Sequence, residues 1–332
     1  MLVSILIPAY NSEKWISDAI RSALDQTWPK KEIIVVDDGS RDNTLSIARS
    51  FESNTVKVIG QDNRGASAAR NKALSFAQGD YIQWLDADDV LALDKIAQQL
   101  KDAEDGKTTR VLRSSSWGRF YYRKRKAKFI PNALWQDMTP TEWIYRKLDE
   151  NAWMAIESWL VSRKLTELGG PWDDSLTMDD DGEYFCRVVR ACEKIAFVPE
   201  AKSFCRSGNL SSISSCADSS VAKLESQFIS MRRHIASMLS LEDSKRTRVV
   251  CIKYLQRWLI HFYPERLEIV QEARALARKL EGDLSLPSQK WKYGLIRRAF
   301  GWQASKRAQR LMPAARVLLE REWDGLLFKL NI

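Results

Sequence analysis

The first hundred residues alternate short apolar runs with segments of helical periodicity. The apolar runs are typical of buried strands and lie at residues 2–7, 32–36, 56–59 and 81–85. Between them, apolar side chains recur three and four positions apart, which predicts helices at residues 13–27, around 42–51 and at 66–77. Strands that alternate with helices in this way predict an α/β fold, a mostly parallel sheet flanked by helices.

The rest of the chain follows a different pattern. Residues 109–216 hold a strand candidate at 109–115, Trp-rich helical patterns and a loop-like segment at 203–215. From residue 217 onward, apolar side chains recur at helical spacing, which predicts an all-helical C-terminal region. We therefore expect an α/β domain at residues 1–216 and a basic helical region at residues 217–332.

Polar side chains follow three of the predicted strands, at residues 9–11, 37–40 and 86–89. The carboxyl ends of parallel strands meet at one edge of a sheet, where ligands bind. Asp86 and Asp88 are two apart, so their carboxylates can converge on one hard cation such as Mg²⁺ or Mn²⁺. An acidic loop that is merely solvated is the alternative interpretation.

Asp38 has a similar ambiguity. Its carboxylate can accept a hydrogen bond from the N–H of a nucleobase, but Asp38-Gly39 also favours a turn and Asp42 can cap the next helix. Both interpretations can hold together. A dehydrogenase is not expected, because no G-x-G-x-x-G follows the first strand.

Charge divides the 332 residues unevenly. Residues 1–220 carry 30 basic and 32 acidic side chains, whereas residues 221–332 carry 22 basic and 11 acidic ones, a net of +11. The hydrophobic fraction of 45% excludes a disordered chain as a whole. The basic tail predicts contact with an anionic partner, either membrane or nucleic acid, and a set of solvated helix faces is the alternative.

Membrane spans and disulfides are not expected. The longest early apolar run, residues 2–8, is far below the roughly 20 residues of a spanning helix, and it lacks the basic start of a signal peptide. The five cysteines are odd in number and form no C-x-x-C pair, so neither a disulfide framework nor a zinc site is indicated. A reducing cytosol fits this pattern.

Five short blocks follow one another in a characteristic order. They are VSILIPAYN at 3–11, VDDGS at 36–40, NRG with ARN within 63–71, GDYI at 79–82 and LDADD at 85–89. Together they closely resemble family 2 glycosyltransferases, clearly over residues 2–101 and more weakly over 168–187. The resemblance implies a GT-A fold and an inverting hexosyl- or N-acetylhexosaminyltransferase that uses Mn²⁺ or Mg²⁺ and a nucleotide-sugar donor.

The resemblance also implies how the nucleotide is bound. Pro8, Ala9 and Tyr10 match the segment that holds the nucleotide, with Tyr10 stacked on the base. Asp38 matches the carboxylate that recognises the base, typically uracil, which favours a UDP-linked donor.

The same resemblance implies the diphosphate and metal site. Asp86 and Asp88 match the motif that binds metal and diphosphate, with Asp88 the more direct ligand. Asn63 and Arg70 match positions that line the donor pocket. Arg70 has a simpler alternative, an ion pair with an acidic neighbour.

A catalytic base is implied by a later block. Inversion needs a carboxylate that deprotonates the acceptor hydroxyl, and the family places it six residues before an Arg, in a Glu/Asp-Asp pair. Asp181 lies six before Arg187, so Asp181 is the expected base, with Asp180 as the fallback because three Asp run together. Gly182 departs from the larger residue common there. The alternative is an acidic helix start capped by Asp179.

Acceptor-side features are less specific. We expect one of Trp153, Trp159 and Trp172 to stack on the acceptor. Arg206, in the predicted loop, can reach the diphosphate if that loop closes as a lid, whereas a surface loop without such a role fits equally. Processive members of the family carry a Gln-x-x-Arg-Trp motif. Gln256-Arg-Trp258 lacks the two residues between Gln and Arg, and we interpret it as core packing. This favours the addition of a single sugar over polymerisation.

Two basic segments, 119–128 and 284–319, interleave Lys and Arg with aromatic residues. This composition suits an anionic membrane surface or a diphosphate-linked lipid acceptor. Nucleic acid is not expected as a partner, because no binding motif supports it.

We therefore expect a cytoplasmic enzyme, peripheral on the inner membrane face, that transfers one sugar to a glycan or lipid-linked acceptor in cell-surface polysaccharide synthesis. A nucleotidyltransferase and a non-catalytic nucleotide-binding scaffold are the alternatives.

Overall fold

A five-stranded sheet forms the centre of the first half of the computed structural model, which describes residues 1–103, 109–208, 220–287 and 294–330. Its first four strands are parallel and the last is antiparallel, so the predicted α/β fold is confirmed. In spatial order they are β3 (Val56–Gly60), β2 (Lys31–Asp37), β1 (Val3–Ala9), β4 (Tyr81–Trp84) and β8 (Val161–Ser162).

The two faces of this sheet are covered by the three expected helices, α1 (Ile16–Leu24), α2 (Thr44–Arg49) and α3 (Ala66–Phe76). Alternate strand residues point to opposite faces. Ile5 and Ile7 accordingly share an apolar cluster with α1, whereas Leu6 packs in the cluster that contains Ala69 and Ala73 of α3. The continuous apolar runs of the sequence thus reflect a sheet that is buried on both faces.

A second sheet of four strands adjoins the first. Its central strands are parallel and register-shifted between Ser115 and Ser116. The strands, in spatial order, are β5 (Val90–Leu91), β9 (Lys194–Arg206), β6 (Val111–Phe120) and β7 (Lys128–Phe129). The loop expected at 203–215 is therefore wrong over residues 203–206, because Ser203 and Phe204 pair with β5. Residues 209–215 lie outside the described part of the chain.

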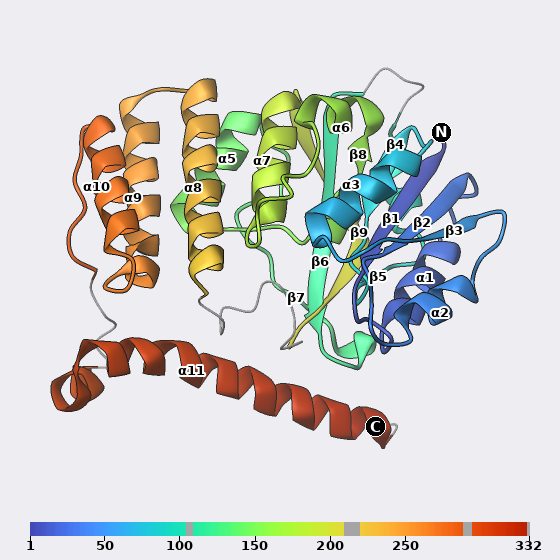
Figure 1. Cartoon of the computed structure of the whole chain (residues 1–332). Helices are drawn as coiled ribbons and strands as arrows, with labels where there is room; N and C mark the ends of the chain where they lie inside the picture. The colour runs from blue at the N-terminus through green and yellow to red at the C-terminus, as the bar shows by residue number, and fades with distance from the viewer. Residues whose placement is uncertain (104–108, 209–219, 288–293, 331–332) are drawn as a thin grey trace.

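Short helices join these strands. They are α4 (Lys95–Leu100), η1 (Lys124–Lys126), α5 (Pro140–Glu150), η2 (Ile156–Ser158), α6 (Arg163–Gly169) and α7 (Asp180–Ala191). Thr139 and Ser162 cap α5 and α6 by accepting hydrogen bonds from backbone amides of the first turn. In Figure 1, α7 stands between the sheets and the C-terminal helices.

The C-terminal region is helical, as expected. Helices α8 (Val221–Leu241), α9 (Lys245–Phe262) and α10 (Leu267–Lys279) stand in a row beside α5 and α7, and α11 (Gly294–Lys329), kinked at Gly301, runs beneath the molecule (Figure 1). The apolar cluster of α8–α10 is continuous with that of the sheet. The predicted boundary at residues 216/217 lies outside the described residues.

Two further observations concern the cysteines and helices of the described residues. Within the described residues, Cys186, Cys192, Cys205 and Cys251 are free. No helix in the described part of the chain is long and apolar enough to cross a membrane. The Gln256–Trp258 segment lies in α9, where Trp258 packs against the main apolar cluster, as expected from core packing.

Candidate active site

The loops after β1 and β2 are joined at the carboxyl edge of the first sheet. The amide of Asn11 donates to Ser40 Oγ (3.0 Å), and the amide of Arg41 donates to Asn11 Oδ1 (2.9 Å). Asn11 adopts a positive φ of 46°, a conformation that Asn tolerates better than most residues. This geometry leaves Ala9 buried and the Tyr10 ring 45% exposed, available for stacking at the sheet edge.

Asp38 is buried and organises the next loop. Its carboxylate accepts hydrogen bonds from Gln61 Nε2 (2.7 Å) and from the amides of Arg64 (2.9 Å) and Gly65 (2.8 Å). Asn63 Nδ2 donates to the Asp38 carbonyl (2.9 Å). The structure therefore brings the predicted nucleotide residues Asp38 and Asn63 together. Recognition of a base by Asp38 stays a prediction.

Asp86 and Asp88 follow β4 and are both partly exposed. Asp86 Oδ1 accepts from Arg70 (2.9 Å), and the backbone carbonyl of Asp88 accepts from Arg206 Nε (2.8 Å). Two carboxylates at one strand end form the all-oxygen donor set that Mg²⁺ and Mn²⁺ prefer. The residues present thus fit a divalent metal.

Arg70 connects this motif to the acidic helix. Its guanidinium is buried and bonds Asp86 through Nη2 (2.9 Å) and Asp180 through Nη1 (2.7 Å). Burial disfavours the charged form, but these two carboxylates outweigh burial and raise the pKa of Arg70. The Trp172 ring lies 4.5 Å from the guanidinium carbon and covers its face. The expected ion pair of Arg70 is confirmed, and it reaches Asp180, which lies 110 residues further along the sequence.

Asp181 begins helix α7 next to Asp180 and is partly buried. Burial, followed by the nearby carboxylates of Asp180 and Asp179, raises the pKa of Asp181 from 3.8 to about 7. Its carboxylate accepts a hydrogen bond from the adjacent Gly182 amide (2.8 Å). A carboxyl group with a pKa near neutrality can accept a proton and release it again at physiological pH.

Asp179 does not cap α7 through its side chain, contrary to the alternative interpretation. It has a left-handed backbone (φ 58°), and its carboxylate instead accepts from Ser230 Oγ (2.7 Å) of α8. A Cβ atom at Gly182 would clash with this carboxylate. Glycine at 182, the departure from the family pattern, therefore accommodates the side chain of Asp179.

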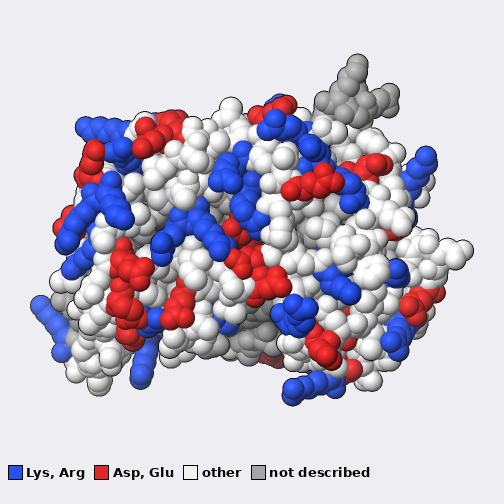
Figure 2. Space-filling view, turned by 45° about the horizontal axis from the view of Figure 1, so that its top comes forward, with Lys and Arg blue, Asp and Glu red and all other residues white. Residues whose placement is uncertain are grey.

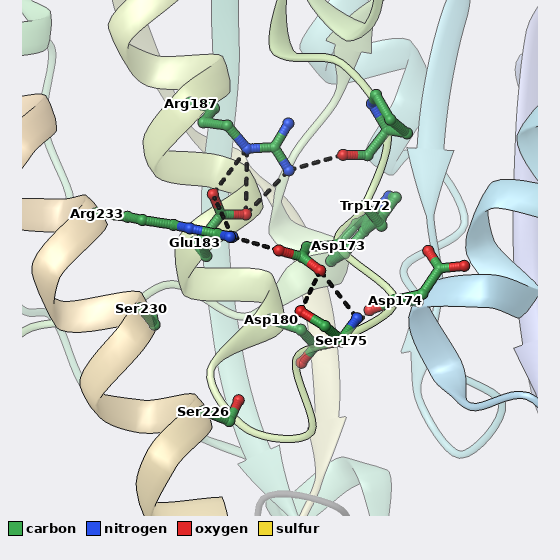
Figure 3. A network of polar contacts seen from close by, with 12 residues as sticks. Trp172, Asp173, Asp174, Ser175, Asp180, Glu183, Arg187, Ser226, Ser230 and Arg233 are labelled. Atoms are coloured by element: carbon green, nitrogen blue, oxygen red, sulfur yellow. Dashed lines mark hydrogen bonds and ion pairs between the residues drawn. The ribbon is translucent and has the colours of Figure 1, made fainter.

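Arg187 holds the rest of α7 in place (Figure 3). Its guanidinium pairs with Glu183 (2.9 Å) and donates to the carbonyls of Gly169 and Pro171. Arg233 of α8 adds an ion pair to Asp173 (2.6 Å). The network borders an open hollow of about 470 Å³ beside Trp172. Sequence reasoning missed Arg233, because no motif marks a residue that joins the site from a distant helix.

The prediction that Arg206 lies in a lid loop is wrong. This residue ends β9 and is largely buried instead of lying in a lid, and besides Asp88 it bonds the Tyr121 carbonyl (2.9 Å) and Asp18 (3.2 Å). Its guanidinium also lies 4.0 Å from the Trp15 ring centroid. These contacts hold Arg206 against the Asp88 backbone, so it positions the loop of this candidate metal ligand from the side of the second sheet.

Behind the metal motif lies a buried acidic cluster that the sequence did not reveal. Ligand atoms of Asp89, Glu157 and Cys205 lie within 4.8 Å of one another. Burial and the neighbouring carboxylates raise the pKa of Asp89 well above its usual range, and burial raises that of Glu157 to about 7. Asp89 also accepts from the Arg206 amide (2.6 Å). The cluster therefore anchors the loop that carries Asp88, and burial disfavours the charged forms of its carboxyl groups.

The three tryptophans differ in exposure. Trp159 and Trp172 are buried, so neither can stack on an acceptor, whereas Trp153 is 39% exposed. Trp153 packs on Trp117 with ring centroids 4.3 Å apart, and Arg119 lies over both rings. Of the three candidates, Trp153 alone stays available for acceptor contact.

Known proteins resemble the first half of this chain in sequence. Residues 4–166 match the model of the family described as "Glycosyl transferase family 2". Over 103 residues, 30% of this chain, it is 44% identical to Bacillus subtilis TuaG, named as a teichuronic acid biosynthesis glycosyltransferase. Over 100 residues it is 41% identical to Escherichia coli WfgD, named as a UDP-Glc:alpha-D-GlcNAc-diphosphoundecaprenol beta-1,3-glucosyltransferase. These matches span 41% and 40% of the two relatives.

Solved structures resemble the chain over nearly its whole length. Staphylococcus aureus TarS 1–349 in complex with UDP-GlcNAc gives a TM-score of 0.66 at 18% identity, covering 94% of this chain and 92% of that one. The mannosyltransferase PcManGT of Pyrobaculum calidifontis, in complex with GDP-Man and Mn²⁺, gives 0.53 at 19% identity, covering 97% and 87%. At these identities the likeness establishes the fold, a GT-A domain followed by helices.

Proposed function

This chain belongs, through residues 4–166, to glycosyl transferase family 2, and we propose that it moves one sugar from a UDP-sugar to a glycan or lipid-linked acceptor. The relatives named for teichuronic acid biosynthesis and for a diphosphoundecaprenol-linked acceptor support a role in cell-surface polysaccharide synthesis. They are matched over less than half of their length, so this role belongs to the proposal.

The observation that carries the proposal is the double ion pair of Arg70. It holds Asp86 of the metal motif and Asp180, the neighbour of the candidate base, on one buried guanidinium. Donor activation and acceptor deprotonation must occur within one bond-forming geometry. A single side chain that orients both carboxylate groups supports a reaction between two bound substrates.

Asp86 and Asp88 are the residues that would hold Mn²⁺ or Mg²⁺. When bound, such an ion supplies positive charge that stabilises the departing nucleoside diphosphate. Arg70 donates to Oδ1 of Asp86, and a carboxylate offers a second oxygen that can bind a cation. The PcManGT complex with Mn²⁺ supports the same type of cofactor.

Asp181 is proposed as the base of an inverting transfer. Its carboxylate accepts the proton of the acceptor hydroxyl as that oxygen bonds to the anomeric carbon, and the bond from this carbon to UDP breaks on the opposite face. The pKa of about 7 suits this role, because the base is then ionised at neutral pH and still able to hold a proton. Asp180 forms an ion pair with Arg70, so it is only the second candidate for the catalytic base.

The donor end is assigned to the first two loops. Tyr10 offers an exposed ring for the base, Pro8 and Ala9 form the strand end beneath it, and Asp38 with Asn63 lies at the adjoining loop. The TarS structure in complex with UDP-GlcNAc supports a UDP-linked donor. We place the enzyme at the cytoplasmic face of the membrane as a peripheral protein that adds a single sugar.

The test is nucleotide release from a panel of UDP- and GDP-sugars with Mn²⁺ and a mixture of glycan acceptors. UDP release that depends on acceptor supports the proposal, whereas pyrophosphate release from a nucleoside triphosphate would identify a nucleotidyltransferase instead. Asp181→Asn should lose transfer but keep UDP binding. Asp243→Asn, an exposed carboxylate at the start of α9, is the matched control and should keep both. A scaffold protein would bind UDP without turnover in any variant.

A further inference from the structure

The outer face of α11 carries a stripe of exposed apolar side chains. Met312, Leu319, Trp323, Leu326 and Leu330 are spaced seven, four, three and four residues apart, which places them on one side of a helix. Each is about half exposed or more, and Leu319 reaches 73%. Monomeric soluble proteins rarely leave so many large apolar side chains together in water. We call these five residues the outer stripe.

The opposite side of α11 anchors the helix to the body. Asp324 is buried, pairs with Arg123 (2.7 Å) and accepts from the Tyr122 amide (2.9 Å). The Phe328 ring stacks on that of Tyr122, with centroids 6.0 Å apart. Towards the other end, Lys306 donates to the Tyr263 carbonyl (2.6 Å). The helix is therefore held at two places with the outer stripe turned away from its anchors.

Tertiary structure brings a basic segment to the same helix. Directly after the anchoring residues 121–123, η1 and β7 expose Lys124, Arg125, Lys126 and Lys128. This basic segment, residues 124–128, is about 200 residues away from α11 in sequence, yet both lie at the lower end of the molecule in Figure 1. The face drawn in Figure 2 carries basic and acidic side chains in several adjoining groups of both signs.

We propose that the outer stripe and the basic segment together dock the enzyme on an anionic bilayer, with α11 lying in the plane of the headgroups. An in-plane helix buries its apolar side among the acyl chains, and adjacent Lys and Arg side chains attract anionic lipid. The choice of a membrane rests on the proposed lipid-linked acceptor. A second copy of this chain fits less well, because pairing α11 with its copy would also bring two basic segments towards each other.

The position of this surface suits a lipid-linked acceptor. The backbone carbonyl of Tyr121, one of the anchoring residues, accepts a hydrogen bond from Arg206, and Arg206 also donates to the carbonyl of Asp88. Trp15, next to the donor loop, packs against Tyr122 with centroids 5.6 Å apart. The docking surface therefore adjoins the candidate metal motif, and an acceptor sugar on a membrane-embedded diphosphate lipid would have a short path to it.

Co-sedimentation of the full-length protein with phosphatidylcholine vesicles, with and without phosphatidylglycerol, tests the proposal. Replacing Leu319, Trp323 and Leu326 by Ser should abolish binding to both. Replacing Lys124, Arg125 and Lys126 by Gln should weaken partitioning into phosphatidylglycerol vesicles about a hundredfold, from roughly 1 kcal/mol per basic side chain near the surface. Two control variants change exposed Leu and basic residues elsewhere. They are Leu168→Ser with Leu267→Ser, and Lys245→Gln with Arg278→Gln and Lys279→Gln.

Binding unchanged in both test variants, or lowered equally in the controls, would overturn the proposal. A dimer that dissociates in the stripe variant, with no vesicle binding by the wild type, would assign the stripe to a second copy instead. UDP binding and transfer to a water-soluble acceptor should persist in the test variants, because none of these residues lies in the candidate active site. If the wild type binds vesicles but never releases UDP, the proposed function fails and the docking surface stands.

Discussion

Replacing Asp181 by Asn should make the protein inactive and, above neutral pH, more stable. The folded state raises the pKa of this carboxyl from 3.8 to about 7, so ionising it costs folding free energy. A pKa difference of about 3 corresponds to about 4 kcal/mol at pH 8, which we take as a ceiling because the side chain is partly exposed and coupled to its neighbours. Asn keeps the shape and can accept the Gly182 amide, so an increase of about 2 kcal/mol is expected.

The sign of the pH dependence makes this prediction specific. A carboxyl with a raised pKa costs nothing below pH 3.8, where both states are protonated, and its cost grows until the pH passes about 7. The advantage of the Asn variant in urea unfolding, measured in EDTA, should therefore rise from pH 4 to pH 7 and then level off.

Asp243→Asn should behave in the opposite way. A hydrogen bond from Arg248 lowers the pKa of Asp243, so this substitution should destabilise the protein above pH 4. An Asp181→Asn variant that is no more stable at pH 8, or whose advantage does not depend on pH, would refute the burial argument. Transfer should fall by about 10²–10⁴, the usual contribution of a general base. Retained turnover would place the base elsewhere.

The remaining predictions concern the same site. The rate of transfer should rise with pH up to about 7, as Asp181 becomes ionised, and a flat pH–rate profile would contradict its role. Arg70→Lys should destabilise the fold by about 2–3 kcal/mol in urea unfolding and lower the rate more than tenfold, because one ammonium cannot bridge two carboxylates as the guanidinium does. UDP binding measured by calorimetry should require Mn²⁺ or Mg²⁺, and equal affinity in EDTA would rule out the metal role of Asp86 and Asp88. Trp172→Ala should cost about 3–5 kcal/mol, since it removes a buried ring that packs on Arg70 and Tyr184; a loss below 1 kcal/mol would contradict this packing.

Local patterns predicted most of the first half of the fold. The apolar runs and helical spacings of residues 1–101 correspond to β1–β4 and α1–α3 to within a few residues, because each element is specified by side chains close in sequence. The second sheet was harder to foresee. Residues 203–206 look like a polar loop, but they pair with the distant strands β5 and β6, which satisfy their backbone groups.

The candidate site shows the same division. Polar residues that follow strands can be recognised in the sequence, so Asp38, Asp86 and Asp88 were assigned as candidates from the sequence, and their roles stay predictions. Arg206 was assigned to the wrong element, and Arg233, Asp89 and Glu157 were missed, because their roles arise from contacts that no local pattern encodes. A resemblance to a family supplied Asp181, while its raised pKa depends on burial between α7 and its neighbours.

The sequence by itself determined the α/β order of the first half, the helical tail, the uneven charge and the chemistry available at the strand ends. Tertiary structure decided which of these groups meet. Arg70 joins the candidate metal motif to the acidic start of α7, and α11 is anchored at Arg123, directly before the basic segment. The physical reason is one of range: hydrophobic periodicity and capping act over a few residues, whereas ion pairs and exposed surfaces depend on contacts between segments that only the folded chain brings together.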